Sequence, residues 1–310
     1  MRSLLALSLL ACGLAGARAD DSKPATSNVP RAEYPRIHPD RRVTFRLRAP
    51  DVKGVKVQPG GADNGLGKGP YEMGRSDEGT WTVTVPPAVP GFHYYWLVVD
   101  GVSVNDPGSE TFFGYGRPTS GVEVPEPGAD YYDAKDVPHG EVRSLWYHSK
   151  VTGSPRRAMV YTPPGYDADT RKRYPVLYLQ HGAGEDERGW TTQGRANFIL
   201  DNLIAAGKAV PMIVVMDNGY AAKAGAAPAT AQGGRPGPPM FDFRGFGEVL
   251  LGELIPKVDA TYRTMSDPVR PTSSFCVTPS PLASDVSRTN WSAVRPSGAS
   301  SAFVRRCSAR

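Results

Sequence analysis

Cysteine is scarce in this 310-residue sequence, which contains only Cys12, Cys276 and Cys307. Residues 20–268 have none, so a body folded from them relies on core packing without disulfide bonds. Long apolar runs are also missing. Leu4 to Leu14 is too short to cross a bilayer, and no other segment is long enough. These absences exclude a disulfide-stapled scaffold and predict no transmembrane segment.

A basic surface stripe is absent as well, although the net charge is +5. Residues 269–310 hold six Arg and one Asp, a surplus of five, so residues 1–268 are neutral overall. No basic stretch alternates with aromatic residues, and we therefore expect no nucleic-acid partner. The acidic run Glu185-Asp186-Glu187 has no histidine at ligand spacing apart from His181. It predicts a solvated loop rather than a metal site, and we expect neither metal nor cofactor.

The N-terminus has the layout of a secretory signal. Arg2 supplies a positive charge, the apolar stretch follows, and Ala17-Arg18-Ala19 offers a cleavage site before Asp20. Residues 1–19 are therefore predicted to be a signal peptide of a secreted or periplasmic protein. Lipid anchoring at Cys12 is the alternative.

Residues 41–125 read as an antiparallel β-sandwich after a linker over residues 20–40. Short alternating stretches such as residues 43–47 and 81–85 are separated by Gly and Pro, a pattern typical of such sandwiches. The aromatic residues Trp81, Tyr94, Tyr95 and Trp96 have the strand spacing of core residues rather than of a sugar platform. Residues 126–140 are the expected linker to a second domain.

From residue 141 to residue 268 the pattern becomes that of an α/β domain with a mostly parallel sheet. Residues 174–180 and 211–216 are nearly continuous apolar runs, as in strands buried on both faces. Residues 196–206 carry a helical stripe, and a second stripe runs from Phe246 to Val258, with Pro256 expected to kink or restart that helix.

A Gly-rich turn, Gln180-His181-Gly182-Ala183-Gly184, follows the first of these strands. Acyl transfer places negative charge on a carbonyl oxygen, and backbone N–H groups at such a turn stabilise it. Gly182 and Ala183 are therefore candidates for half of an oxyanion hole, although a plain strand-to-loop turn fits the sequence equally. His181 is a candidate pocket residue that more often anchors a loop than acts as a base. Trp190 either lines an acyl pocket or packs beneath the loop.

Three ordered stretches resemble the feruloyl-esterase and acetyl-xylan-esterase branch of the α/β hydrolases. They are residues 178–187, 194–205 and 211–216, followed by Leu254-Ile255-Pro256 and Tyr262-Arg263. Residues 40–125 are similar to the early-set, glycogen-binding-like sandwich that precedes such esterases. The resemblance implies a carboxylic-ester hydrolase acting on feruloyl or acetyl esters of plant cell-wall polysaccharide.

The same resemblance calls for a G-x-S-x-G elbow soon after Tyr262, then an acid and a histidine. None is present: the nearest match, Gly298 to Ala302, has Ala in place of the second Gly, and the five histidines all lie at or before His181. We therefore predict no catalytic residue in this chain and an inactive protein. Residues 269–310 read as a non-family tail, either an out-of-frame translation or a natural disordered segment.

Two other functions remain open from the sequence. A siderophore esterase of the enterochelin type has the same sandwich-plus-hydrolase order. A carbohydrate-binding protein would use the sandwich alone.

Overall fold

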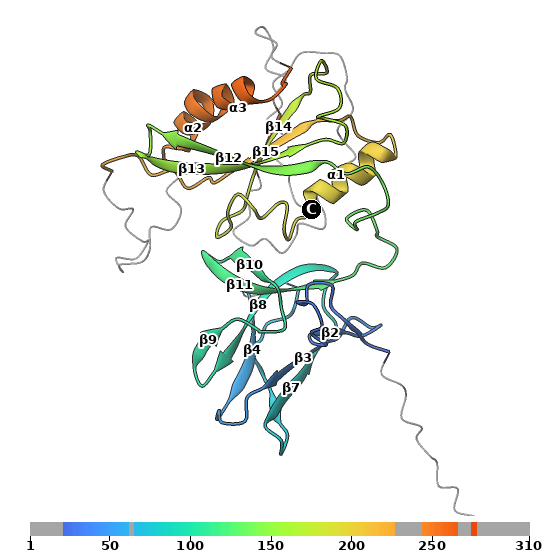
Figure 1. Ribbon diagram of the computed structural model, residues 1–310. Helices are drawn as coiled ribbons and strands as arrows, with labels where there is room; N and C mark the ends of the chain where they lie inside the picture. The colour runs from blue at the N-terminus through green and yellow to red at the C-terminus, as the bar shows by residue number, and fades with distance from the viewer. Residues whose placement is uncertain (1–20, 62–64, 227–243, 266–273, 278–310) are drawn as a thin grey trace, which may run out of the picture.

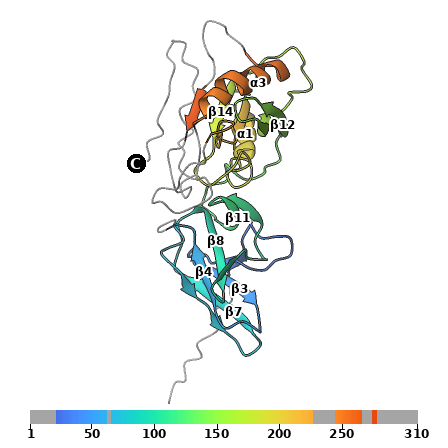
Figure 2. The ribbon, with the colours of Figure 1, turned by 90° about the vertical axis from the view of Figure 1, so that its left-hand side faces the viewer.

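The computed structural model describes residues 21–61, 65–226, 244–265 and 274–277. The predicted signal peptide, Cys12 and most of the predicted tail lie outside these residues. Two bodies are stacked in Figures 1 and 2: a β-sandwich formed by residues 21–124, and above it a sheet with helices on both faces, formed by residues 141–277 and called here the sheet domain.

The β-sandwich consists of two antiparallel sheets. The first has, in spatial order, β1 (Lys23–Pro24), β2 (Arg36–Ile37), β3 (Val43–Arg48), β7 (Thr80–Val85) and β6 (Gly74–Arg75). The second has β10 (Thr111–Gly114), β11 (Arg117–Val124), β8 (Gly91–Val99), β4 (Val55–Pro59) and β5 (Tyr71–Glu72), with β9 (Val102–Val104) beside β8.

Alternation builds the sandwich core, because successive side chains of a strand point to opposite faces. In β4, Val55 and Val57 are fully buried while the intervening Lys56 is paired with Glu72 at the surface. The rings of Phe45 and Tyr95 meet across the two sheets at 4.8 Å. Trp81 and Tyr95 belong to this core, as their spacing predicted. Tyr94 is buried outside this core, and the prediction is wrong for Trp96, which is half-buried outside it.

The predicted linker over residues 20–40 requires correction. Its described part supplies β1 and β2, and Ser22, Ala25 and Ser27 are buried. The Pro-rich composition suggested an extended tether, but strands of two residues carry too little alternation to be recognised. Residues 125–140, by contrast, contain no strand or helix and connect the two bodies.

The sheet domain has the strand order β12 (Glu141–Ser149), β13 (Ser154–Thr162), β15 (Ile213–Asp217), β14 (Val176–Gln180), β16 (Ser274–Val277). Its first two strands form a hairpin, and β13 pairs antiparallel with β15. Only the pairs β15–β14 and β14–β16 are parallel. The prediction of a mostly parallel sheet is thus wrong for the described strands. It failed because the charged sequence before residue 163 was not recognised as a hairpin.

Helices cover both faces of this sheet. Along β15, Val214 and Met216 pack on the face that carries α1 (Ala196–Ala205), whereas Ile213 and Val215 pack on the opposite face with Leu254. The opposite face is covered by α2 (Phe246–Val249), the π-helix η1 (Leu250–Leu254) and α3 (Ile255–Thr261), which form one continuous rod in Figure 1.

Pro256 explains the π-helical turn. It lies at the start of α3, directly after η1. Proline has no N–H to donate and its ring crowds the preceding turn, so a wider turn accommodates it without ending the rod. The expected restart at Pro256 therefore takes the form of a π-bulge rather than a kink.

One segment of the predicted tail is ordered. The backbone of Ser274–Val277 forms β16, parallel to β14 with Leu177 opposite Ser274 and Gln180 opposite Val277. The expectation that the pattern stops at Pro268 is corrected for these four residues, which are too few to show a period. No described helix has the length and apolarity needed to cross a membrane.

Candidate functional site

The Gly-rich turn lies at the carboxyl end of β14, between two parallel neighbours, β15 and β16. Ligands of open sheets of this kind bind outside the carboxyl ends of their strands. The turn is buried except at Ala183, which is half-buried. Each peptide group of this turn is held by a different partner, and these partners decide which N–H group is available to a ligand.

His181 fixes the peptide group that joins Gly182 to Ala183. Its Nε2 accepts the Gly219 N–H at 3.0 Å, which places the ring proton on Nδ1, and Nδ1 donates to the Gly182 carbonyl at 2.8 Å. Because a trans peptide directs its C=O and N–H to opposite sides, the Ala183 N–H points away from His181. Both ring nitrogens of His181 are engaged, so the ring anchors the turn and has no free nitrogen for a base.

The neighbouring N–H groups are already used. Gly182 N–H donates to the Glu185 carboxylate at 3.2 Å, and Gly184 N–H donates to the Tyr220 hydroxyl at 2.6 Å. Among the described residues, the Ala183 N–H has no protein acceptor. Of the two candidates for the oxyanion hole, only Ala183 therefore presents a free donor in this geometry.

A buried ion pair supports the loop that holds His181. Arg156, from β13, donates to the Asp217 carboxylate at 2.9 Å and also binds the carbonyls of Asn218 and Tyr220. Burial raises the pKa of Asp217, and the charge of Arg156 opposes that rise. The Arg156 guanidinium therefore holds the loop that follows β15 in place.

The acidic run after the turn is buried, which corrects the expectation of a solvated loop. Glu185, Asp186 and Glu187 are each at most 7% exposed. Asp186 pairs with Arg188, and Glu187 pairs with Arg157. Three adjacent acids suggested solvent, and sequence alone gave no view of the partners that neutralise them. The described residues contain no group of ligands able to hold a metal ion.

Trp190 lies beneath the turn. It is 6% exposed, packs with Leu179 and Leu200 in the core on the α1 face, and donates its Nε1–H to the Gln180 carbonyl at 2.9 Å. This geometry favours the packing interpretation over the acyl-pocket interpretation that the sequence left open.

The β-sandwich contacts the turn directly. Tyr94, from β8, donates its hydroxyl to Glu185 at 2.7 Å and accepts a bond from Gln193 at 2.5 Å. The hairpin between β10 and β11 adds a backbone bond from Gly116 N–H to the Gly184 carbonyl at 2.8 Å. Tyr94, Gln193 and Tyr220 were not predicted as site residues, because nothing local in the sequence marks side chains that meet only after folding.

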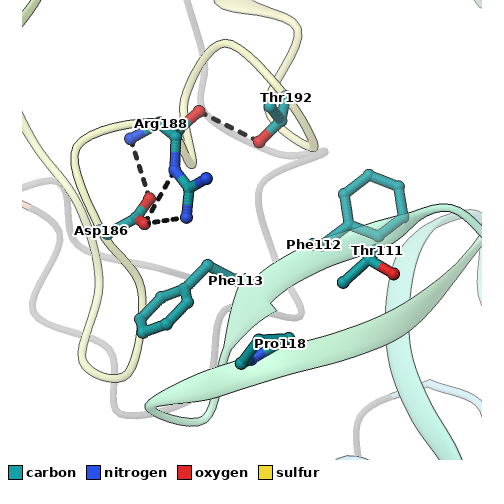
Figure 3. A pocket seen from close by; sticks show the side chains of 7 residues that line it. All are labelled: Thr111, Phe112, Phe113, Pro118, Asp186, Arg188 and Thr192. Atoms are coloured by element: carbon teal, nitrogen blue, oxygen red, sulfur yellow. Dashed lines mark hydrogen bonds and ion pairs between the residues drawn. The ribbon is translucent and has the colours of Figure 1, made fainter. Parts of the chain in front are cut away.

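A small cavity of about 120 Å³ lies at this junction. Figure 3 shows Phe112, Phe113 and Pro118 of the hairpin on one side and the Asp186–Arg188 pair of the loop on the other. Arg188 lies 5.9 Å from the Phe113 ring centre and is held by Asp186. The cavity is a packing gap between the two bodies, too small for an aromatic ester.

The sequence after β16 lacks a G-x-S-x-G motif. β16 ends at Val277, and the sequence continues Thr278-Pro279-Ser280-Pro281-Leu282, without the glycines that a G-x-S-x-G turn requires. Of the five histidines, all lie within the described residues, and only His181 adjoins the turn.

Known esterases resemble this chain in sequence and in fold. Residues 149–273 match the model of the family described as "Putative esterase". The chain is 40% identical over 253 residues to an endo-1,4-beta-xylanase/feruloyl esterase from Xylanibacter ruminicola, an alignment that covers 80% of this chain and 33% of the relative. This chain thus spans about a third of the length of the curated relative it matches.

Two solved structures are also similar. An enterobactin esterase from Shigella flexneri is 18% identical, with a TM-score of 0.52 over 76% of this chain and 63% of that one, a likeness of fold. A ferulic acid esterase from Anaeromyces mucronatus is 29% identical, with a TM-score of 0.41 over 48% of this chain and 53% of that one. The family model and the Xylanibacter relative support an esterase family for this chain.

Proposed function

We propose that this chain is an exported ester-binding protein of the feruloyl-esterase and acetyl-xylan-esterase type that does not itself hydrolyse esters. The match to the esterase model and the 40% identity to a xylanase/feruloyl esterase support the ester class. Feruloyl and acetyl esters of plant cell-wall polysaccharide are the proposed ligands. The signal-like residues 1–19 support export.

The observation that carries this proposal is the free Ala183 N–H at the carboxyl end of β14. Of the Gly182, Ala183 and Gly184 N–H groups, it is the one that the described protein groups leave open, and the bonds of its neighbours fix its direction. A preorganised N–H of this kind binds a carbonyl oxygen and, in a hydrolase, the oxyanion that forms from it. Ala183 therefore supplies half of an oxyanion hole.

The absence of turnover follows from the chemistry that acyl transfer requires. A serine hydroxyl is a weak nucleophile unless a base removes its proton. Here His181 uses both ring nitrogens to hold backbone, and the text after β16 has no elbow. The turn can hold an ester carbonyl, but among the described residues no hydroxyl beside it pairs with an imidazole nitrogen that is free to act as a base.

The test is to measure both turnover and binding with the purified chain. We expect no hydrolysis of methyl ferulate and saturable binding of ferulate, followed by fluorescence. Ala183→Pro, which removes the N–H, should abolish binding, whereas Ala183→Gly, which retains it, should bind as the parent does. Turnover that is lost on Ser280→Ala or Ser300→Ala would contradict the non-hydrolytic part, and equal binding by both Ala183 variants would contradict the role of the N–H.

The alternative ligand is a siderophore ester. Its support is the likeness of fold between this chain and the enterobactin esterase. A catecholate triester and methyl ferulate, offered in the same titration, separate the two. Tighter binding of the triester would favour the alternative.

Carbohydrate binding by the β-sandwich has a specific observation in its favour. Trp96 is half-buried outside the core, edge-on to Tyr115 at 5.8 Å, with the Arg117 guanidinium 4.6 Å from its ring centre. Tyr115 is 39% exposed. We propose that these side chains contact the sugar. Retention on xylan that Trp96→Ala abolishes and Val102→Ala leaves unchanged would support this, and equal retention would contradict it.

A further inference from the structure

The three acids that follow the Gly-rich turn have two different kinds of partner. Asp186 and Glu187 each pair with an arginine of the sheet domain itself. Among the described residues, Glu185 has no cationic partner. Its carboxylate accepts from the Tyr94 hydroxyl at 2.7 Å on one oxygen and from Gly182 N–H at 3.2 Å on the other. The sandwich therefore supplies the strongest donor to this buried acid.

The Tyr94 hydroxyl stays protonated and therefore remains a hydrogen-bond donor. Tyr94 is 5% exposed, and burial together with the nearby Glu185 charge raises its pKa well above the usual tyrosine value. Gln193 donates to the same hydroxyl oxygen at 2.5 Å, which directs the Tyr94 proton toward Glu185. A hydrogen bond to a charged acceptor in a buried setting is stronger than a neutral one.

The consequence reaches the peptide groups of the turn. Glu185 is oriented by Tyr94 and in turn holds Gly182 N–H, so this N–H is directed away from any ligand at Ala183. Gly116 holds the Gly184 carbonyl from the same side. Gly184 has a φ of +87°, and a Cβ there would lie 2.9 Å from the Tyr115 nitrogen, so the hairpin approaches as closely as glycine permits.

We propose that Tyr94 of the β-sandwich is a positioning residue of the ester site, which acts through Glu185 to set the conformation of the Gly182–Gly184 turn. The sandwich is then a structural part of that site as well as a separate module. The meaning of the turn as an ester site rests on the proposed function, whereas the control of its conformation by Tyr94 does not.

The experiment compares Tyr94→Phe with Tyr95→Phe in the full chain. Tyr95 is the matched control, because its hydroxyl also donates to a buried carboxylate at 2.7 Å, that of Asp106, but within the sandwich. Amide hydrogen exchange is followed over residues 181–187. We expect exchange about tenfold faster in Tyr94→Phe, the usual effect of losing a hydrogen bond to a charged group, and parent-like exchange in Tyr95→Phe. Equal rates in both variants would overturn the proposal.

A second variant guards against simple unfolding. Glu185→Gln keeps an acceptor for Tyr94 but places an amide opposite Gly182 N–H, so exchange at the turn should rise while β13 remains protected as in the parent. Loss of protection in β13 as well would show a merely structural effect and contradict the proposal. Ferulate binding is measured in parallel: a tenfold loss confined to Tyr94→Phe and Glu185→Gln supports a positioning role. Absence of ferulate binding in the parent refutes the proposed function and leaves the exchange result to decide the proposal.

Discussion

Among the described residues, the β-sandwich buries two charged side chains, Asp106 and Glu123, whereas the sheet domain buries six charged side chains. These six are Arg156, Glu185, Asp186, Glu187, Asp201 and Asp217. The sandwich is closed mainly by apolar packing between its two sheets. In the sheet domain, apolar cores cover both faces, and buried charges fasten the loops at the carboxyl ends of the strands.

The difference separates what stabilises the fold from what shapes the site. Apolar packing tolerates substitutions of similar volume, whereas a buried charge demands its own partner in its own geometry. Loops held by charges therefore keep one conformation, and the Gly-rich turn lies among them. The four predictions below test this contrast, from the largest expected effect to the smallest.

Arg156→Met should cause the largest loss of stability. It leaves the Asp217 carboxylate buried without its guanidinium, and one oxygen of Asp217 already has no partner. Removing one member of a buried pair costs about 3–5 kcal/mol. Chemical denaturation measures the free energy of unfolding. Lys56→Met, which breaks an exposed pair of the sandwich, is the control and should cost less than about 1 kcal/mol. Similar losses in both variants would remove the contrast.

Glu123 should make the stability of the β-sandwich depend on pH. Burial raises its pKa from 4.5 to about 7, against the opposing charge of Arg195. Because the folded pKa is the higher one, the stability it contributes is fully present below pH 4.5 and is lost as pH rises toward 7. Glu123→Gln should remove this loss, so its stability relative to the parent should increase by up to about 3 kcal/mol between pH 4.5 and pH 8. Parallel pH profiles of the two proteins would contradict the prediction.

Gly184→Ala should loosen the junction between the two bodies. The left-handed φ costs about 1 kcal/mol for alanine, and the collision with the Tyr115 backbone adds to it. Gly207→Ala is the control, because Gly207 also has a positive φ of 66° but has open space around its Cβ position. A loss of about 1–3 kcal/mol for Gly184→Ala beyond that of the control is expected. Equal losses would mean that the hairpin yields without cost.

His139 should show the smallest effect. Its hydrogen bond to Asp201 raises its pKa above 6.5 and ties the connecting segment to α1. The contribution is present below pH 6.5 and lost as pH rises through the folded pKa. An NMR titration of His139 should give a pKa above 6.5, and Asp201→Asn should lower it. A His139 pKa unaffected by that substitution would show that the hydrogen bond between His139 and Asp201 does not form in solution.

The sequence predicted those elements whose period is long enough to read. The strands at residues 176–180 and 213–217 and the helix at 196–205 were found, because each carries a continuous run or a helical stripe of apolar residues. The strands β1, β2 and β16 were missed, because two to four residues cannot show a period. The hairpin β12–β13 was missed because its exposed edge is charged.

For the candidate site, the sequence predicted the turn but not its surroundings. Gly182 and Ala183 were identified from composition, yet only the structure distinguishes them, since Gly182 N–H is taken by Glu185. The burial of the acidic run depends on Arg157, Arg188 and Tyr94. Tyr94 lies 91 residues before Glu185 in the chain. No local sequence pattern predicts such long-range contacts.

The Gly-rich turn takes its shape from neighbours at positions 94, 116, 181 and 220, each fixing a different peptide group. A segment copied from Gln180 to Glu187 into another scaffold would carry the letters of the motif without its conformation. Transplanting this site therefore means moving the hairpin of one body and the strand end of another along with eight residues of loop.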